Sequence, residues 1–188
     1  MANKDAAFGL KPIGKIGQNA DNNGLSEYDI AASATAIYFQ DPVEILATGT
    51  IGVAAAGDTT ILGSLNGVFF TDANTSKPTF ANHLDASNAA TDIKGFVTDD
   101  PYQRYEIQAD GATAAADVGL NADFVYAAGS SPDYVSKVEL DTSDQKTGTA
   151  QLRIIGISKD PENNTAGSAN VNCVVIINEH QLKGTTGV

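Results

Sequence analysis

The chain has 188 residues, of which 42% are hydrophobic and 18% are charged, and its formal net charge is −12. This length suits one domain with a real core, and the composition is too apolar for wholesale disorder. The negative charge argues against nucleic acid or an anionic membrane as a partner, because both are bound chiefly through Lys and Arg.

Cys173 is the single cysteine, and it lies in the apolar run VNCVVIIN. We therefore expect a buried thiol without an intrachain disulfide or a redox role. No stretch reaches the roughly 18 unbroken apolar residues that span a bilayer, and the start of the chain shows no secretory signal. We expect a soluble protein made in a cytoplasm.

Residues 1–35 mix Gly, Asn, Asp and Ala with scattered apolar residues and no helical stripe, which predicts an extended N-terminal arm. Within residues 1–20, three lysines stand against one aspartate, a net charge of +2. An extended segment cannot bury apolar residues on itself, so the arm lies along its own domain or along a neighbour, where it can add a strand to a groove. Its candidate partner contacts are Lys4, Phe8, Leu10, Lys11, Pro12, Ile13, Lys15 and Ile16.

Over residues 36–188, short β-type runs alternate with turn residues, which predicts a β domain. The runs are AIYFQ (36–40), PVEIL (42–46), TIGVAA (50–55), TTILGSL (59–65), GVFFTD (67–72), KGFVTD (94–99), RYEIQA (104–109), DFVYAA (123–128), KVELD (137–141), QLRIIGIS (151–158) and VNCVVIIN (171–178). Two Ala-rich stretches, 81–93 and 112–119, predict single helical turns at most. We expect an all-β fold, either a small antiparallel barrel or a jelly-roll-like sandwich, with an extended N-terminal arm.

Three runs carry more detailed predictions. RYEIQA alternates between an apolar face and a polar face with Glu106 and Gln108, which is typical of a half-buried strand. VNCVVIIN is apolar on both faces towards its end, which predicts a central strand. Asn66-Gly67 separates two apolar runs, so residues 57–72 are predicted to be a hairpin with a type I′ turn.

The sequence contains no nucleophile elbow, phosphate-binding loop or H-E-x-x-H motif. His83 beside Asp85 and His180 beside Glu179 lack the spacing of a metal site. The acidic loops 141–148 and 158–168 lack the ligand order of a calcium loop and are interpreted as solvated turns, with an adventitious Ca²⁺ site as the alternative. We therefore predict no enzymatic activity, no catalytic residue, no cofactor and no metal.

The segment TDDPYQRYE (98–106) combines tyrosines, an arginine and two aspartates. Tyr and Arg are enriched at interface hot spots, so Tyr102 and Arg104 are further candidate partner contacts. The alternative is an ordinary strand entrance closed by an aromatic side chain.

The order of several segments resembles a known family. These segments are AAFGLKPIGKIGQ, SEYDIAASATAIYFQDPV, GTIGVAAAGDTTILGSLNGVFF, QLRIIGIS and VVIINEHQL, and together they cover most of residues 6–182. Their order is similar to that of the capsid decoration, or cement, proteins of tailed bacteriophages. The resemblance implies a β-rich module that binds the outside of the assembled shell, with arms on the major capsid protein.

From this resemblance we expect a structural virion protein on the outer surface of the capsid that stabilises the shell. Its expected partners are the major capsid protein and further copies of itself, with a homotrimer preferred by analogy. The alternatives are a receptor- or carbohydrate-binding β-domain on the virion surface, a head-joining or tail component, and a hydrolase that assembles His83 with Asp85 or Asp99. The absence of tryptophan argues mildly against carbohydrate binding.

Overall fold

The computed structural model describes residues 2–18, 24–57 and 60–183. The remaining residues, which fall in the predicted arm, the predicted hairpin and the end of the chain, lie outside the described residues. Within the described part the strands are β1 (Lys11–Lys15), β2 (Ser26–Asp29), β3 (Pro42–Ile45), β4 (Ile51–Val53), β5 (Gly63–Thr71), β6 (Pro78–Ala81), β7 (Lys94–Thr98), β8 (Gln103–Gln108), β9 (Asn121–Ala122), β10 (Phe124–Val125), β11 (Glu139–Leu140), β12 (Leu152–Ile157) and β13 (Asn172–Ile177). The 3₁₀ turns are η1 (Ile16–Gln18), η2 (Ala115–Asp117) and η3 (Gln181–Lys183). The all-β prediction is confirmed.

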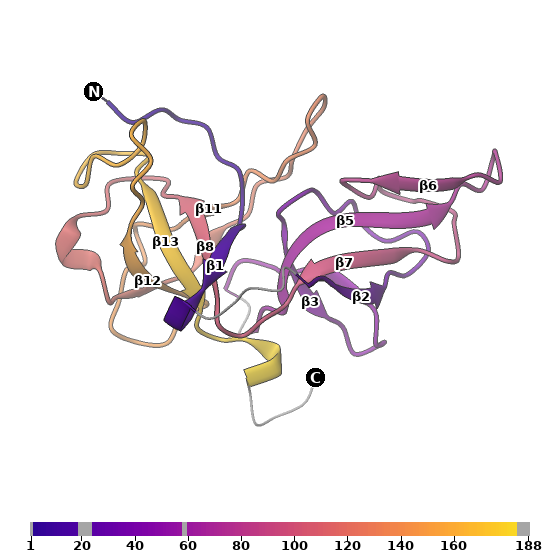
Figure 1. The fold of residues 1–188 in the computed structure, drawn as a ribbon, viewed down its shortest axis with the longest axis horizontal. Coiled ribbons are helices and arrows are strands. Elements are labelled where there is room, and N and C mark those ends of the chain that lie inside the picture. The colour runs from indigo at the N-terminus through magenta and orange to yellow at the C-terminus, as the bar shows by residue number, and fades with distance from the viewer. Residues whose placement is uncertain (1, 19–23, 58–59, 184–188) are drawn as a thin grey trace.

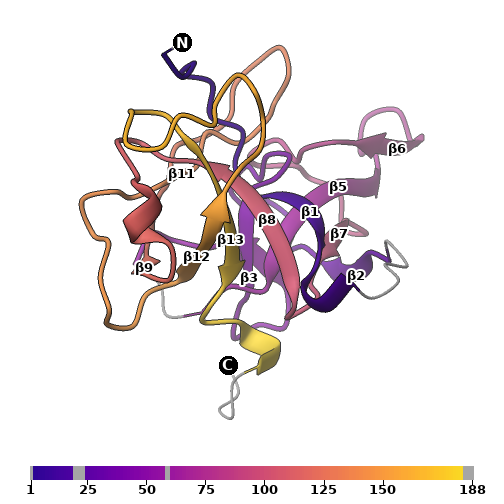
Figure 2. The ribbon, with the colours of Figure 1, turned by 60° about the vertical axis from the view of Figure 1, so that its left-hand side comes forward.

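The strands form two main antiparallel sheets. One has five strands in the order β1-β8-β13-β12-β9, and the other has six, in the order β2-β7-β5-β3-β4 with β6 beside β5. Figure 1 shows the two sheets next to each other, and Figure 2 shows the order of the five-stranded sheet. Both sheets are open, so the sandwich alternative fits the structure and the closed barrel does not.

Each main sheet covers its own apolar cluster. The five-stranded sheet packs Tyr105, Ile107, Cys173 and Val175 into a core that also includes Leu10. The central position predicted for VNCVVIIN is confirmed, since β13 is the middle strand of five. Burial raises the pKa of the Cys173 thiol to about 11, which keeps it protonated at neutral pH.

The six-stranded sheet packs a second cluster around Ile30, Ile51, Leu65 and Val97. Its strands approach one another closely at Gly63, where a Cβ would lie 2.1 Å from the Thr98 carbonyl oxygen. Only glycine fits there, because a side chain would push β5 away from the end of β7.

The hairpin predicted at Asn66-Gly67 is wrong. Residues 63–71 form one continuous strand, and Asn66 is an extra residue in a bulge between the pairs Leu65↔Val97 and Gly67↔Phe96. The strand continues because β7 pairs with it on one side while β3 and β6 pair with it on the other. These long-range ladders override a local turn preference, and the bulge accommodates the extra residue.

The described residues of the predicted arm, 2–18 and 24–35, are not a free arm, since they lie along the same chain's two sheets. Strand β1 pairs with β8 at one sheet edge, and β2 pairs with β7 at the other. This is the first of the two arrangements expected for an apolar extended segment.

The N-terminal segment also changes the environment of β8. Glu106 and Gln108 are buried, so the half-buried pattern predicted for RYEIQA is wrong on its polar face. Ala6 N–H donates to Gln108 Oε1 at 2.8 Å, and Gln108 Nε2 donates to the Lys4 carbonyl at 2.9 Å. The polar face is thus covered by residues that pair with it through hydrogen bonds.

Candidate interaction surface beside the N-terminal strand

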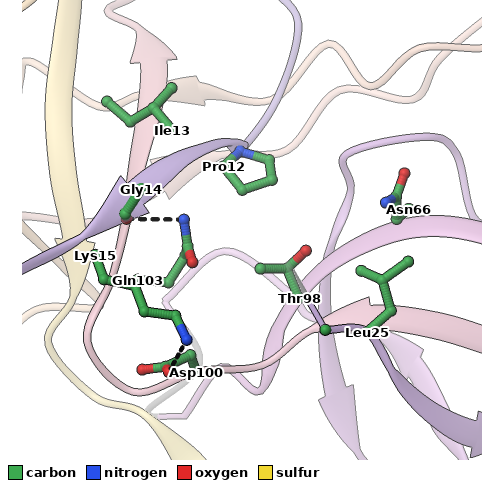
Figure 3. Close-up of a pocket in the computed structure, with 10 residues that line it drawn as sticks. Pro12, Ile13, Gly14, Lys15, Leu25, Asn66, Thr98, Asp100 and Gln103 are labelled. Carbon is green, nitrogen blue, oxygen red and sulfur yellow. Dashed lines mark hydrogen bonds and ion pairs between the residues drawn. The ribbon is translucent and has the colours of Figure 1, made fainter. Parts of the chain in front are cut away.

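A pocket of about 390 Å³ lies beside β1, where the two main sheets meet (Figure 3). Its lining comes from segments far apart in the sequence. The lining residues are Pro12, Ile13, Gly14, Lys15, Gly24, Leu25, Asn66, Thr98, Asp100 and Gln103.

Polar contacts hold the wall that belongs to the five-stranded sheet. Gln103 Nε2 donates to the Gly14 carbonyl at 2.9 Å, and the Lys15 ammonium lies 2.9 Å from the Asp100 carboxylate. The hydrogen bond from Lys15 lowers the pKa of Asp100 below its usual range, so that carboxylate is ionised at neutral pH. The charged groups in this wall are therefore already paired.

The opposite wall belongs to the six-stranded sheet. Thr98 is the last residue of β7, Asn66 is the bulged residue of β5, and Leu25 directly precedes β2. Figure 3 shows Leu25 and Pro12 on opposite sides of the hollow. The bulge that replaces the predicted hairpin thus helps to shape this pocket.

Four large apolar side chains are exposed on the pocket-lining segments or next to them, and two of the four, Ile13 and Leu25, line the pocket itself. The four are Ile13 (41% exposed), Ile16 (40%), Leu25 (41%) and Tyr102 (57%). Ile16 also lines a neighbouring hollow with Arg104 and Ile155, and its N–H donates to the Tyr102 carbonyl at 2.9 Å. We call Ile13, Ile16, Leu25 and Tyr102, with the Lys15–Asp100 pair, the β1 surface. A gathering of exposed apolar side chains is typical of an interaction site.

The structure divides the predicted contacts of the N-terminal segment into three groups. Ile13, Lys15 and Ile16 belong to the β1 surface, and Pro12 lines its pocket. Leu10 is fully buried in the core, so its assignment as a partner contact is wrong.

The third group lies towards the other end of the segment. Lys4 and Lys11 are exposed and Phe8 is half-buried. The Lys11 ammonium lies 5.7 Å from the centre of the Phe8 ring and 3.3 Å from Glu106. These contacts stabilise the segment on its own sheet, and they are apart from the pocket.

The segment 98–106 combines the two interpretations made from its sequence. Tyr105 is the buried aromatic residue, and its hydroxyl donates to the Thr98 carbonyl at 2.8 Å. Tyr102 is exposed, with the Lys183 ammonium 4.9 Å from the centre of its ring. Arg104 is half-buried and lines the hollow beside Ile16.

The outer edge of β1 is poorly suited to adding another strand. Pro12 has no N–H to donate, and the register shifts between Pro12 and Gly14, so Ile13 is bulged. A partner at this edge therefore contacts side chains and the pocket. We no longer expect the N-terminal segment to bind a partner by adding a strand to it.

The described residues offer little for metal chemistry. They contain no group of three or more His, Cys, Asp or Glu side chains placed to hold a metal ion. His83 lies 3.3 Å from Asp85, and its ring stacks on Tyr134 with 3.9 Å between ring centres. This histidine connects two loops by packing.

We compared the chain with known protein families, curated proteins and solved structures. No protein-family model, curated protein or solved structure matches this chain. In the described part of the chain, no helix has the length and hydropathy needed to cross a bilayer.

Proposed function

We propose that this protein is a decoration protein of a tailed-phage head, which binds the outside of the capsid and stabilises the shell. The observation that supports the proposal best is the β1 surface, where three separate segments contribute exposed apolar side chains in or near a pocket beside β1. The order of sequence segments that resembles cement proteins supports it independently.

The charge distribution fits this role. The chain carries a net charge of −12, so it is repelled by DNA and remains dispersed at high concentration. The β1 surface contrasts with this acidic body, because its lysine and aspartate are paired and its exposed side chains are apolar. Contact with the major capsid protein therefore buries apolar area without leaving an unpaired charge.

Such binding stabilises a shell without turnover. A ligand that binds the assembled state and not the separated subunits shifts the equilibrium towards assembly. Many copies on one head add many small interfaces that must be broken before the capsomers separate. By analogy with decoration proteins, we propose a homotrimer on a local three-fold axis, with the major capsid protein as the partner.

The test is addition of the purified protein to expanded heads that lack it, followed by measurement of bound copies and of the disruption temperature. We expect saturable binding and a higher disruption temperature. Ile16→Ser should weaken binding by about tenfold or more, since it removes an exposed apolar side chain from the interface. Val118→Ser is the matched control, because Val118 is 41% exposed and follows η2, outside the β1 surface.

Two results would overturn the proposal. One is an unchanged disruption temperature in the presence of bound or added wild-type protein, and the other is equal binding by wild type and Ile16→Ser. Copy number separates the structural alternatives, because a single ring of copies per virion favours a head-joining or tail component. Binding to a host-surface glycan or protein, without any effect on heads, favours the receptor- or carbohydrate-binding alternative.

A further inference from the structure

The two arginines of the chain, Arg104 and Arg153, lie on one face of the five-stranded sheet. In the strand register, Arg104 of β8 and Arg153 of β12 both pair with Ile176 of the central strand β13. Directly paired residues of antiparallel strands point to the same face. Their neighbours along the strands, such as Tyr105 and Val175, point into the core. The arginines therefore flank Ile176 on the outer face of this sheet, whose strand order Figure 2 shows.

The charge of this outer face is opposite to that of the whole protein. Four charged side chains from the strands of the sheet point to it, and they are Lys11, Arg104, Glu106 and Arg153. Three positive charges and one negative charge give 3 − 1 = +2, whereas the chain carries −12. Glu106 lies 3.3 Å from Lys11, so the excess positive charge is that of the two arginines.

The acids on the segments that flank this face are paired with lysines. Asp100, which precedes β8, lies 2.9 Å from Lys15, and Asp123, which follows β9, lies 3.2 Å from Lys146. Within the described residues, neither arginine forms an ion pair. The described part of the chain therefore supplies no carboxylate to this face beyond Glu106.

Arg104 is the less satisfied of the two arginines. Its Nε is buried and has no hydrogen-bond partner in the described part of the chain. Arg153 is exposed, and its Nε donates to Asn121 Oδ1 at 2.9 Å. A buried charged donor without a partner is unfavourable, because it gives up hydration for no new hydrogen bond. An acceptor from outside the chain would offset this cost.

Arg104 lines an open hollow of about 540 Å³ that is otherwise apolar. The other lining residues are Ile16, Gly17 and Ile155. Gly14 pairs with Arg104 across β1 and β8, and a Cβ there would lie 3.3 Å from Arg104 Nη2. Because position 14 has no side chain to cover it, a ligand can reach the guanidinium through its terminal nitrogens.

We propose that this hollow binds the carboxylate of an acidic side chain from a protein partner, with Arg104 as the donor. A guanidinium can donate two parallel hydrogen bonds to one carboxylate. The two isoleucines of the lining pack against an apolar residue beside that acid. Nucleic acid is disfavoured as the occupant, because it is bound through many cationic contacts and the chain as a whole repels it.

The identity of the partner rests on the proposed function. Ile16 belongs both to this hollow and to the β1 surface, so a capsid protein that covers Ile16 also reaches Arg104. We therefore expect the major capsid protein to present an Asp or Glu next to an apolar residue at this contact. The carboxylate site itself is testable on the isolated protein, so it can fail separately from the proposed function.

The first test is a titration of the isolated, full-length, ¹⁵N-labelled protein, observed at the Nε–Hε resonances of its two arginines. The probes are the dipeptide N-acetyl-Leu-Glu-amide and its uncharged counterpart N-acetyl-Leu-Gln-amide. We expect the glutamate dipeptide to shift the Arg104 resonance saturably at about millimolar concentration, and the glutamine dipeptide to leave it unchanged. Arg153 should shift less, since its Nε already has a partner.

The second test measures binding of Arg104→Met to expanded heads that lack the protein. Methionine keeps an unbranched apolar side chain and removes the guanidinium. We expect binding to weaken by about tenfold or more. Lys77→Met is the matched control, because Lys77 is exposed, directly precedes β6 and lies outside this face. It should bind heads as wild type does.

Thermal unfolding separates partner binding from a structural role. If the Arg104 guanidinium has no partner within the chain, Arg104→Met should leave the melting temperature unchanged or raise it. Circular dichroism of wild type and Arg104→Met measures this difference. A clearly lower melting temperature would mean that the guanidinium already stabilises the fold, and would overturn the proposal.

The carboxylate site is also overturned if the two dipeptides shift Arg104 equally, or if neither does. A larger shift with glucuronate or with a short oligonucleotide would assign the hollow to an acidic sugar or to nucleic acid and overturn it too. Equal head binding by wild type and Arg104→Met would overturn the capsid as the partner of this hollow and leave the proposed function intact. If wild type does not bind heads, the proposed function falls, and the dipeptide titration still decides the carboxylate site.

Discussion

The Lys15 ammonium lies 2.9 Å from the Asp100 carboxylate, and this pair joins the N-terminal strand to the loop between the two main sheets. Asp100 also accepts the N–H of Tyr102 at 2.7 Å. One carboxylate therefore fixes both β1 and an exposed aromatic residue of the β1 surface. Asp100 therefore acts mainly by positioning β1 and Tyr102, whatever the strength of its ion pair with Lys15.

We expect the ion pair itself to add little stability. The Lys15 and Asp100 side chains are 24% and 32% exposed, and partly exposed pairs contribute about 0.2–1 kcal/mol. Urea unfolding of Lys15→Met, Asp100→Asn and the double variant gives the coupling energy. A coupling above about 2 kcal/mol would contradict this expectation and indicate a buried pair.

A second prediction concerns pH and Asp41, which is fully buried. Its Oδ2 accepts the N–H of Tyr38 at 2.8 Å and the hydroxyl of Tyr126 at 3.4 Å, and the Ser136 side chain also interacts with this carboxylate. Burial raises the pKa of Asp41 from 3.8 to about 6. The folded protein thus holds this proton more tightly than the unfolded chain does.

The sign follows from proton linkage. Between pH 4 and 6 the folded state binds more protons, so the free energy of unfolding falls as pH rises and levels off above about pH 6. A shift of two pKa units corresponds to roughly 3 kcal/mol. Asp72 and Asp92 have lowered pKa values and act in the opposite direction. The difference between wild type and Asp41→Asn isolates Asp41, and a difference independent of pH would contradict the assignment.

The sequence predicts several strands well because their apolar residues follow strand patterns, although it divides the longest strand, β5, at Asn66-Gly67. Strands β7, β12 and β13 each fall within a predicted run, and β8 begins one residue before its run. Strands β1, β2, β6 and β9 were not predicted as strands, since they are short and lie in polar or glycine-rich segments. Their backbone pairing comes from tertiary partners far along the chain, which local patterns do not contain. The bulge at Asn66 has the same origin.

The candidate surface was predictable in part. Ile13 and Ile16 were identified because they are apolar residues in an extended N-terminal segment. Tyr102 was identified because it lies in a segment that combines tyrosines with an arginine. Leu25, Asn66 and Asp100 were missed as contacts, because only the junction of the two sheets brings them together. Leu10 was misassigned, since an apolar residue in an extended segment gives no local sign of whether its own core covers it.

A third prediction separates core from surface within the N-terminal segment. Leu10 is fully buried, so Leu10→Ala should lower the free energy of unfolding by about 2–5 kcal/mol. Ile13 is 41% exposed, and Ile13→Ala should cost less than about 1 kcal/mol. Denaturant unfolding of both variants checks the difference. Equal small effects would mean that residues 2–16 do not pack on their own domain in solution.

A fourth prediction tests how the N-terminal segment is attached. Gly9 has a φ of +76°, and a Cβ there would lie 2.5 Å from both the Gln40 carbonyl oxygen and Ser136 Cβ. Leu10 N–H donates to that same carbonyl at 2.9 Å, so a side chain at position 9 would push the segment off its anchor. We expect Gly9→Ala to destabilise the protein by about 2–4 kcal/mol, from backbone strain and the clash together.

Gly49 provides the control for backbone strain alone. Its φ is +80°, but a Cβ there meets no atom within 4 Å, so Gly49→Ala should cost about 1 kcal/mol. The comparison by urea unfolding separates the clash from the φ penalty. Near-equal losses for the two variants would contradict the close contact of Gly9 with Gln40 and Ser136. A larger loss for Gly9→Ala, with increased protease cleavage within residues 2–16, would support this close approach as one of the contacts that hold the segment on its domain.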